Sequence, residues 1–269
     1  MIVDSHCHVS RYWYEPVEVL EAQMERVGIA QAVLTQMLGC YDNEYLFTCR
    51  DRLPDRFAVV VGIQESQPDA IERLDACVKR GAVGLRLRPT SRSPGNDPLA
   101  IWRTAEALGI AVTCPGNSAA FLAPEFIALL EEVPRLRVVL EHLGGTSQPD
   151  ADPKAREIRT RVVQELARFP NVYLKVPGLG EVAPRRPVVQ PGASGALQLD
   201  GVAELLEAAR RSFGAERMMW GSDFPLVASR EGYRNALEWT RELLSGASRS
   251  DQELIFGGTA LRVFTPSHA

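Results

Sequence analysis

Residues 57–63 read Phe57-Ala58-Val59-Val60-Val61-Gly62-Ile63, an apolar run with no polar break. A strand with one face in water alternates apolar and polar residues, whereas a strand covered by helices on both faces is apolar throughout. The run therefore predicts a buried strand of a parallel sheet.

On both sides of this run, short β-branched stretches alternate with longer amphipathic ones. The expected strands are residues 1–9, 30–35, 57–63, 82–88, 110–114, 137–142, 171–176 and 217–220. The expected helices are residues 16–27, 43–53, 70–80, 99–108, 124–133, 156–169 and 202–213, with 230–244 and 250–256 closing the chain.

Eight strand–helix units of about thirty residues predict an α/β fold, a (β/α)8 TIM barrel that fills residues 1–269 as a single domain. The alternative is a doubly wound open sheet, which usually has a glycine-rich first turn. Residues 10–14, which follow the first strand, contain no glycine. The Pro/Gly-rich residues 177–201 are too long for an ordinary loop of a barrel, so we expect a lid or a disordered segment there.

The composition is that of a soluble domain with a substantial core, with 45% hydrophobic and 24% charged residues. The net charge of −4 and the lack of a Lys/Arg run argue against nucleic acid or an anionic membrane as partners. The chain shows neither a membrane-spanning run nor a signal-peptide pattern, and its five cysteines form no Cys-x-x-Cys pair. We expect a cytoplasmic protein with reduced thiols and a small-molecule substrate, and a homo-oligomer is left open.

The first strand ends in Asp4-Ser5-His6-Cys7-His8. Because residues i and i+2 of a strand share a face, His6 and His8 should point the same way, close enough to bind one ion or one oxyanion. We expect Asp4 to lie deeper on that face and to support an imidazole. The alternative is a pair of surface imidazoles at a frayed terminus.

Further reactive side chains stand at the predicted ends of later strands. They are Arg86 and Arg88 on the fourth strand, His142 on the sixth, Lys175 on the seventh and Asp223 on the eighth. The active site of a TIM barrel lies at the C-terminal ends of its strands, and the first and eighth strands are neighbours. Asp223 should therefore lie beside His6 and His8.

Four motifs in this order resemble the amidohydrolase superfamily. They are Asp4-Ser5-His6-Cys7-His8, Leu140-Glu141-His142-Leu143-Gly144, Asn171-Val172-Tyr173-Leu174-Lys175 and Met218-Met219-Trp220-Gly221-Ser222-Asp223-Phe224-Pro225. The similarity covers essentially the whole chain and is greatest to the branch that contains sugar lactonases, dicarboxylate lactonases and metal-dependent decarboxylases.

The resemblance implies a role for each of these residues. His6 and His8 would bind a divalent metal, Zn²⁺ or Mn²⁺, or would polarise the substrate carbonyl where no metal is used. Asp223 would be the general base that activates water, and a ligand of the metal if one is present. His142 would be a further ligand or would hold the substrate and its developing oxyanion.

The chain also departs from the family pattern. Metal-dependent members commonly carry a histidine at the end of the fifth strand, where this chain has Cys114, which we interpret as a buried wall residue. The fourth strand offers Arg86 and Arg88 in place of a bridging lysine or glutamate, which argues against two metals. A single metal held by His6, His8 and Asp223, with or without His142, and a metal-independent site both remain open.

Four further residues are candidates for substrate binding. Arg86 either binds a substrate carboxylate or pairs with Glu141 or Asp4, and Lys175 either binds substrate or pairs with a neighbouring acid. Tyr12 and Trp13 either wall a pocket or pack over the barrel mouth. We expect Glu141 itself to face the helices.

The predicted activity is hydrolysis of a lactone of a carboxylated or sugar-derived small molecule, by water that Asp223 activates. The first alternative is a metal-dependent nonoxidative decarboxylase of an unsaturated or aromatic acid. The second is a non-catalytic ligand-binding barrel, against which the joint presence of His6, His8, His142 and Asp223 argues.

Overall fold

The computed structural model describes residues 1–145, 153–186 and 197–265. Within them, eight parallel strands pair in the order in which they follow along the chain. They are β1 (Val3–Cys7), β2 (Gln31–Thr35), β3 (Phe57–Gly62), β4 (Gly84–Arg86), β5 (Ala111–Cys114), β6 (Val138–Leu140), β7 (Val172–Val176) and β8 (Met218–Trp220).

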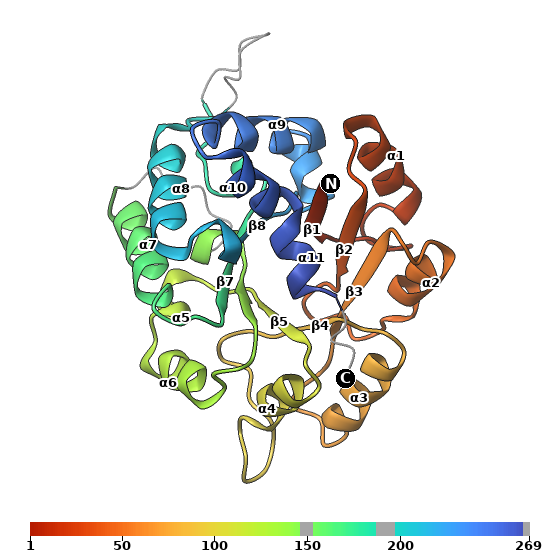
Figure 1. Cartoon of the computed structure of the whole chain (residues 1–269). Coiled ribbons are helices and arrows are strands. Elements are labelled where there is room, and N and C mark those ends of the chain that lie inside the picture. Colours follow the sequence, from red (N-terminus) through yellow and green to blue (C-terminus); the bar gives the residue numbers. More distant parts are fainter. Residues whose placement is uncertain (146–152, 187–196, 266–269) are drawn as a thin grey trace.

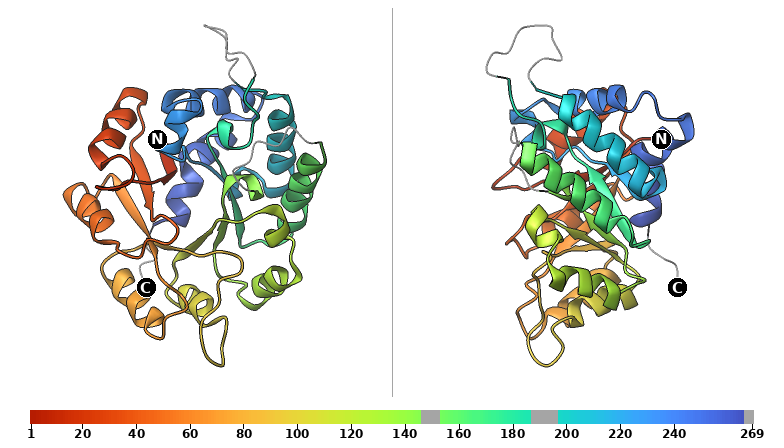
Figure 2. Two further views of the ribbon diagram at one scale, coloured as in Figure 1. Left: turned by 180° about the vertical axis from the view of Figure 1, so that it is seen from behind. Right: turned by 90° about the vertical axis from the view of Figure 1, so that its left-hand side faces the viewer.

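The sheet curves until its two edges meet. The edge between β8 and β1 is joined by a parallel bridge between Cys7 and Phe224. There the backbone N–H of His8 donates to the carbonyl of Phe224 at 2.7 Å, and the N–H of Asp223 donates to the carbonyl of His6 at 2.9 Å. Figures 1 and 2 show the resulting ring of strands with helices around it, which confirms the predicted (β/α)8 barrel.

The helices of the outer ring follow the strands as expected. They are α1 (Val17–Val27), α2 (Glu44–Arg52), α3 (Ala70–Lys79), α4 (Ala100–Ala107), α6 (Pro124–Glu132), α7 (Pro153–Leu166), α8 (Asp200–Phe213) and α9 (Tyr233–Leu243), with a short α5 (Ser118–Phe121) between β5 and α6. The chain closes with α10 (Arg249–Glu253), a π-helical turn (Leu254–Gly258) and α11 (Thr259–Val263). Among the described residues, no helix combines the length and apolarity needed to cross a bilayer.

The apolar core has two parts, one between the strands and the helices and one inside the barrel. The inner part joins strand residues such as Val60 and Val139 to Ala260, Val263 and Phe264 at the end of the chain. Each large apolar side chain buried in this way contributes about 1.5–3 kcal/mol. The closing helix α11 thus seals the N-terminal end of the strands (Figure 1). We call the opposite, C-terminal end of the strands the mouth.

The expected lid or disordered segment is partly a wall of the barrel. A 3-10 turn (Leu179–Glu181, η2) follows β7, and it is buried together with Val182 and Ala183. A bridge between Arg185 and Leu197 then joins the two described ends of the segment. Disorder is wrong for this first part, because its leucine, valine and alanine side chains pack into the core, whereas a lid stays a prediction. Residues 187–196 and the tail histidine, His268, lie outside the described residues.

Candidate active site

His6 and His8 point together into the mouth. Their rings are 4.8 Å apart between centroids and nearly perpendicular, and both side chains are buried. Val3 faces inward, so strict alternation along the strand would turn His6 outward. The pairing of β1 with β2 shifts between Asp4 and Cys7, and this shift brings His6 to the inside. The prediction that the two imidazoles share a face is confirmed.

Asp4 does not support an imidazole, and that prediction is wrong. Its carboxylate accepts hydrogen bonds from the backbone N–H of His6 at 3.2 Å, the backbone N–H of Ser222 at 2.8 Å and the hydroxyl of Tyr233 at 2.9 Å. The shift in register places Asp4 on the outer face of the strand, where burial raises the pKa of its carboxyl. Asp4 therefore fixes the backbone of the two segments that carry His6 and Asp223.

The ring of His8 is held in one orientation by a backbone carbonyl. Its Nδ1 lies 2.7 Å from the carbonyl oxygen of Thr35, which can only accept a hydrogen bond, so Nδ1 carries a proton. The other nitrogen, Nε2, lies 3.6 Å from Oδ1 of Asp223. In the neutral ring Nε2 is a lone pair that faces this carboxylate, so both atoms could hold a cation placed between them.

His6 is held from the other side by Lys175. Nζ of Lys175 lies 2.8 Å from Nδ1 of His6, and Nε2 of His6 lies 3.7 Å from Oδ1 of Asp223. Burial lowers the pKa of Lys175 to about 8, although the negative charge of Glu141 acts to raise it. Burial and the charge of Lys175 together lower the pKa of His6 well below its usual value. When Lys175 is charged it donates to Nδ1, and the proton of a neutral His6 then lies on Nε2, facing the mouth.

His142 reaches the mouth through a left-handed turn. The φ angles of His142, Leu143 and Gly144 are 52°, 54° and 71°, a conformation that only glycine adopts freely. The ring of His142 lies 5.4 Å from that of His6. The side chain therefore enters the site directly after Glu141, which is itself turned inward.

Glu141 belongs to the site, and the prediction that it faces the helices is wrong. Its carboxylate accepts from Nε of Arg86 at 3.0 Å and from Nη2 at 2.7 Å, and Oε1 lies 3.9 Å from Nδ1 of His6. Val139 of the same strand faces inward, so alternation turns Glu141 inward too, and the turn at His142 then breaks the alternation. Burial raises the pKa of Glu141, but Arg86 and Lys175 outweigh this and hold it at about 2.

Arg86 makes the ion pair with Glu141 that the sequence left as one of two options. Its third nitrogen, Nη1, donates to the carbonyl of Gln36 at 2.9 Å, so the whole guanidinium is engaged within the protein. Arg88, two residues further on, is exposed.

Asp223 lies in the turn after β8, three residues beyond the end of the strand, and its φ of 62° is in the left-handed region. Its Oδ1 faces His6 and His8, and its Oδ2 accepts from Nη2 of Arg230 at 3.1 Å. Burial raises the pKa of this carboxyl, but the neighbouring rings of His8 and His142 and the charge of Arg230 hold it at about 2. Asp223 is thus an ionised carboxylate at neutral pH.

The comparisons with known proteins agree with this geometry. Residues 3–265 match the model of the amidohydrolase family. The chain belongs to that family. It is an amidohydrolase-type hydrolase, as the four motifs predict.

One curated relative of this amidohydrolase is the L-fucono-1,5-lactonase of Burkholderia ambifaria, which is 26% identical over 97% of this chain and 94% of its own length. An amidohydrolase from Burkholderia multivorans, solved with bound HEPES and separately with bound zinc, has a TM-score of 0.81 at 21% identity, over 99% of this chain and 100% of its own. The 2,6-dihydroxybenzoate decarboxylase of Rhizobium has a TM-score of 0.66 at 17% identity, over 98% of each chain. These solved structures share the fold of the amidohydrolase.

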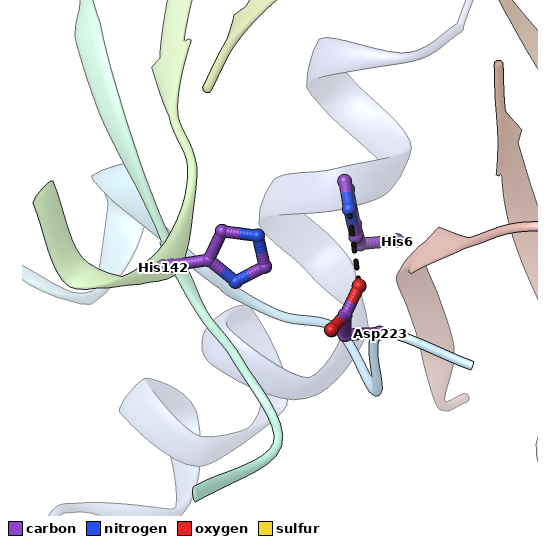
Figure 3. A group of neighbouring side chains, drawn as sticks. All are labelled: His6, His142 and Asp223. Atoms are coloured by element: carbon purple, nitrogen blue, oxygen red, sulfur yellow. Dashed lines mark ion pairs between the residues drawn. The ribbon is translucent and has the colours of Figure 1, made fainter. Parts of the chain in front are cut away.

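A divalent metal fits the donor atoms of the amidohydrolase site. His6, His142 and Asp223 each offer one ligand atom, and these atoms all lie within 4.8 Å of one another (Figure 3). Nε2 of His6 and Nδ1 of His142 are buried and make no hydrogen bond in the described part of the chain. Ligand atoms around zinc are about 3.4 Å apart when the bonds are about 2.1 Å. The distances of 3.6 and 3.7 Å between the imidazoles and Asp223 approach that value.

Cys114 is not part of the site. Its side chain is buried in the outer core, between the strands and the helices. The inward residue of β5 is its neighbour Thr113, whose buried hydroxyl makes no hydrogen bond among the described residues. The interpretation of Cys114 as a wall residue is confirmed.

The aromatic residues of the first loop lie in different environments. Tyr12 and Trp13 are 88% and 79% exposed, and Oγ of Ser10 accepts from both of their backbone N–H groups. The side chain that reaches the site is Tyr14, whose ring lies 5.8 Å from that of His8.

Sequence reasoning missed Arg230 and Glu181, whereas Tyr14 belongs to the first-loop aromatics that it offered as a possible pocket wall. Arg230 and Glu181 come from the loops after β8 and β7, and they are joined by an ion pair next to Asp223. Neither residue stands at a strand end, where the barrel topology indicates chemistry, so no pattern in the sequence singled them out.

Proposed function

We propose that this amidohydrolase opens the lactone ring of a neutral, sugar-derived substrate by attack of water. The observation that supports this most is the arrangement of one Asp223 oxygen 3.6 and 3.7 Å from two buried imidazole nitrogens. This places a proton acceptor and the Nε2–H donor of His6 around one point at the mouth, with Nε2 of His8 beside them. The lactonase relative from Burkholderia supports a cyclic ester as the substrate class.

The chemistry assigns a task to each group. Asp223 accepts a proton from water as the oxygen of that water attacks the lactone carbonyl. Nε2–H of His6, set by Lys175 at Nδ1, donates to the carbonyl oxygen as negative charge develops on it. When the ring C–O bond breaks, the proton on Asp223 passes to the leaving alkoxide, which gives a hydroxy acid and restores the carboxylate.

The residues that would hold a metal are His6, His8, His142 and Asp223. When bound, a zinc or manganese ion would polarise the carbonyl, and zinc would lower the pKa of bound water from 15.7 to about 7. With a metal present, Nε2 of His6 would be a ligand and not a hydrogen-bond donor, so its proton would be displaced.

The pairing of charges at the mouth favours a neutral substrate. Arg86 is engaged by Glu141, Lys175 contacts His6, and Arg230 is shared between Asp223 and Glu181. A carboxylate that approached Arg86, Lys175 or Arg230 would have to displace one of these partners, and breaking a buried ion pair costs about 3–5 kcal/mol. This replaces the expectation that Arg86 selects substrates with a carboxylate.

The two alternatives make different demands on the site. A nonoxidative decarboxylase, like the Rhizobium neighbour, acts on an acid, and a divalent metal held by His6, His142 and Asp223 would supply the cation for that carboxylate. Release of CO2 that depends on added metal would therefore separate it from lactone opening. A non-catalytic barrel would bind its ligand without needing the ionised Asp223 between two imidazoles.

The experiment compares neutral and carboxylated lactones of the same ring size. Purified protein is assayed by proton release, with the spontaneous hydrolysis subtracted, after chelation and again after addition of Zn²⁺ or Mn²⁺. We expect kcat/KM for neutral sugar lactones to exceed that for carboxylated lactones by at least about tenfold, the effect of 1.4 kcal/mol. Preference for the carboxylated lactone, or release of CO2 from an acid without lactone opening, would overturn the proposal.

A further inference from the structure

Arg230 lies at the centre of a group of buried charges from two loops. It follows a 3-10 turn (Leu226–Ser229, η4) and extends its guanidinium between two carboxylates. Nη2 donates to Oδ2 of Asp223 at 3.1 Å, and Nη1 forms a close ion pair with Glu181. Nε lies 3.7 Å from Oε2 of Glu231.

This arrangement fixes which oxygen of Asp223 faces the mouth. The terminal torsion of an aspartate is broad, so a carboxylate without a partner turns and exchanges its two oxygens. Arg230 holds Oδ2, which leaves Oδ1 toward His6 and His8. A base held in one orientation needs no reorganisation when water arrives.

Arg230 is in turn held by the loop after β7. Glu181 is buried, and burial raises the pKa of its carboxyl, so it gains from a cationic partner. Oε1 of Glu231 accepts from the backbone N–H of Gly180 at 3.0 Å, which fixes the turn that carries Glu181. A side chain at position 180 would clash with the carboxylate of Glu231 and would lie 2.8 Å from Cβ of Arg230.

We propose that Arg230 is a positioning residue for Asp223, and that Glu181 and Glu231 hold Arg230 in place. We call these three residues the brace. The brace links the loops after β7 and β8, so the orientation of the base depends on both loops. The kinetic part of this inference rests on the proposed lactone hydrolysis, whereas the orientation of Asp223 does not.

The kinetic test uses Arg230→Ala, Arg230→Lys and the charge-neutral Gly180→Ala. The matched control is Arg234→Ala, which removes an exposed arginine of α9 that pairs with Glu238 at 3.5 Å. We expect Arg230→Ala to lower kcat about 100-fold with KM nearly unchanged, because it misplaces the base and leaves substrate contacts intact. Arg230→Lys should be intermediate, because an ammonium has no planar fork with which to join two carboxylates. Gly180→Ala should lower kcat although it changes no charge.

Chemical rescue separates positioning from damage to the fold. Added guanidinium ion should restore part of the kcat of Arg230→Ala and leave Arg234→Ala unchanged. An unchanged kcat, a rise in KM alone, or a loss of kcat that guanidinium does not restore would each overturn the role of Arg230.

A second measurement does not depend on activity. The chain has four histidines, so ¹⁵N spectra of protein labelled at histidine resolve the imidazoles of His6 and His8. We expect these signals to move in Arg230→Ala, because Oδ1 of Asp223 leaves their surroundings, and to stay in place in Arg234→Ala. Unmoved signals would overturn the brace, whereas a wild-type protein that opens no lactone would overturn only the proposed function.

Discussion

Glu141 shows how a single buried residue joins stability to function. It is fully buried, it accepts two hydrogen bonds from Arg86, and it lies 3.9 Å from the imidazole of His6. The ion pair between Arg86 and Glu141 fixes both side chains at the mouth, and it neutralises the charge of Arg86 that a substrate would otherwise meet. The structural cost of losing Glu141 should therefore appear together with a change in substrate preference.

The pH dependence of stability follows from the pKa of Glu141, which is lowered from 4.5 to about 2. A depressed pKa in the folded state stabilises the protein at pH values above the unfolded pKa, and this contribution is lost as the pH falls from 4.5 toward 2. The shift corresponds to about 3 kcal/mol. We expect Glu141→Gln to lower the free energy of unfolding at pH 7 by several kcal/mol, and this difference should shrink in acid.

Urea denaturation of the wild type and of Glu141→Gln between pH 7 and pH 3 checks this prediction. The matched control is Glu238→Gln, which removes an exposed partner of Arg234 and should cost little at any pH. Parallel stability profiles for the wild type and Glu141→Gln would contradict the assignment of a buried, ionised Glu141.

At the scale of elements, the turn after β6 decides where His142 lies. Gly144 has φ of 71°, and a Cβ there would lie 2.8 Å from Cγ1 of Val162 on α7. Gly144→Ala should therefore be destabilising by about 1–2 kcal/mol and should lower kcat, because it displaces the ring of His142. Thermal unfolding and kinetics measure the two effects.

Gly246→Ala is the control for this turn, because a Cβ at position 246 would meet no atom within 4 Å. It should leave both the melting temperature and kcat close to those of the wild type. A Gly144→Ala variant with the stability and kcat of the wild type would show that the turn does not determine the position of His142.

The elements could be predicted because their signals are local. Residues 57–63 are apolar throughout, and β3 (Phe57–Gly62) forms there, while Gly28 ends α1 as the pattern indicates. The strand ends then place His6, His8, His142, Lys175 and Asp223 in one region. What the sequence did not show depends on exceptions to regular geometry, namely the register shift in β1 and the left-handed turn at His142. The contact of Arg230 with Asp223 depends on how loops fold, which periodicity does not encode.

At the scale of the whole molecule, the last helix closes one end of the barrel and thereby supports the other. Phe264 lies in the inner core, and Nζ of Lys175 stands 5.5 Å from the centre of its ring. The closing helix thus connects the sealed end of the barrel with the charged groups at the mouth. Substitutions at Phe264 should therefore change the position of Lys175 and, through Lys175, the position of the His6 ring.

Phe264→Ala tests this connection. We expect a loss of about 3–5 kcal/mol in the free energy of unfolding, as for other large-to-small changes in a core, together with a lower kcat. The control is Ile71→Ala on α3, because Ile71 is an exposed apolar residue and its loss should cost little. A Phe264→Ala variant as stable as Ile71→Ala would contradict the role of the closing helix.

The central claim is that Asp223, held between His6 and His8, is the base that opens a neutral lactone. The most direct measurement is kcat for a sugar lactone with wild-type protein and with Asp223→Asn, alongside the affinity of both for the hydroxy-acid product. We predict that Asp223→Asn loses at least about 100-fold in kcat, the lower range for a general base, while the product still binds. An Asp223→Asn variant that turns over the lactone at the rate of the wild type would contradict the claim.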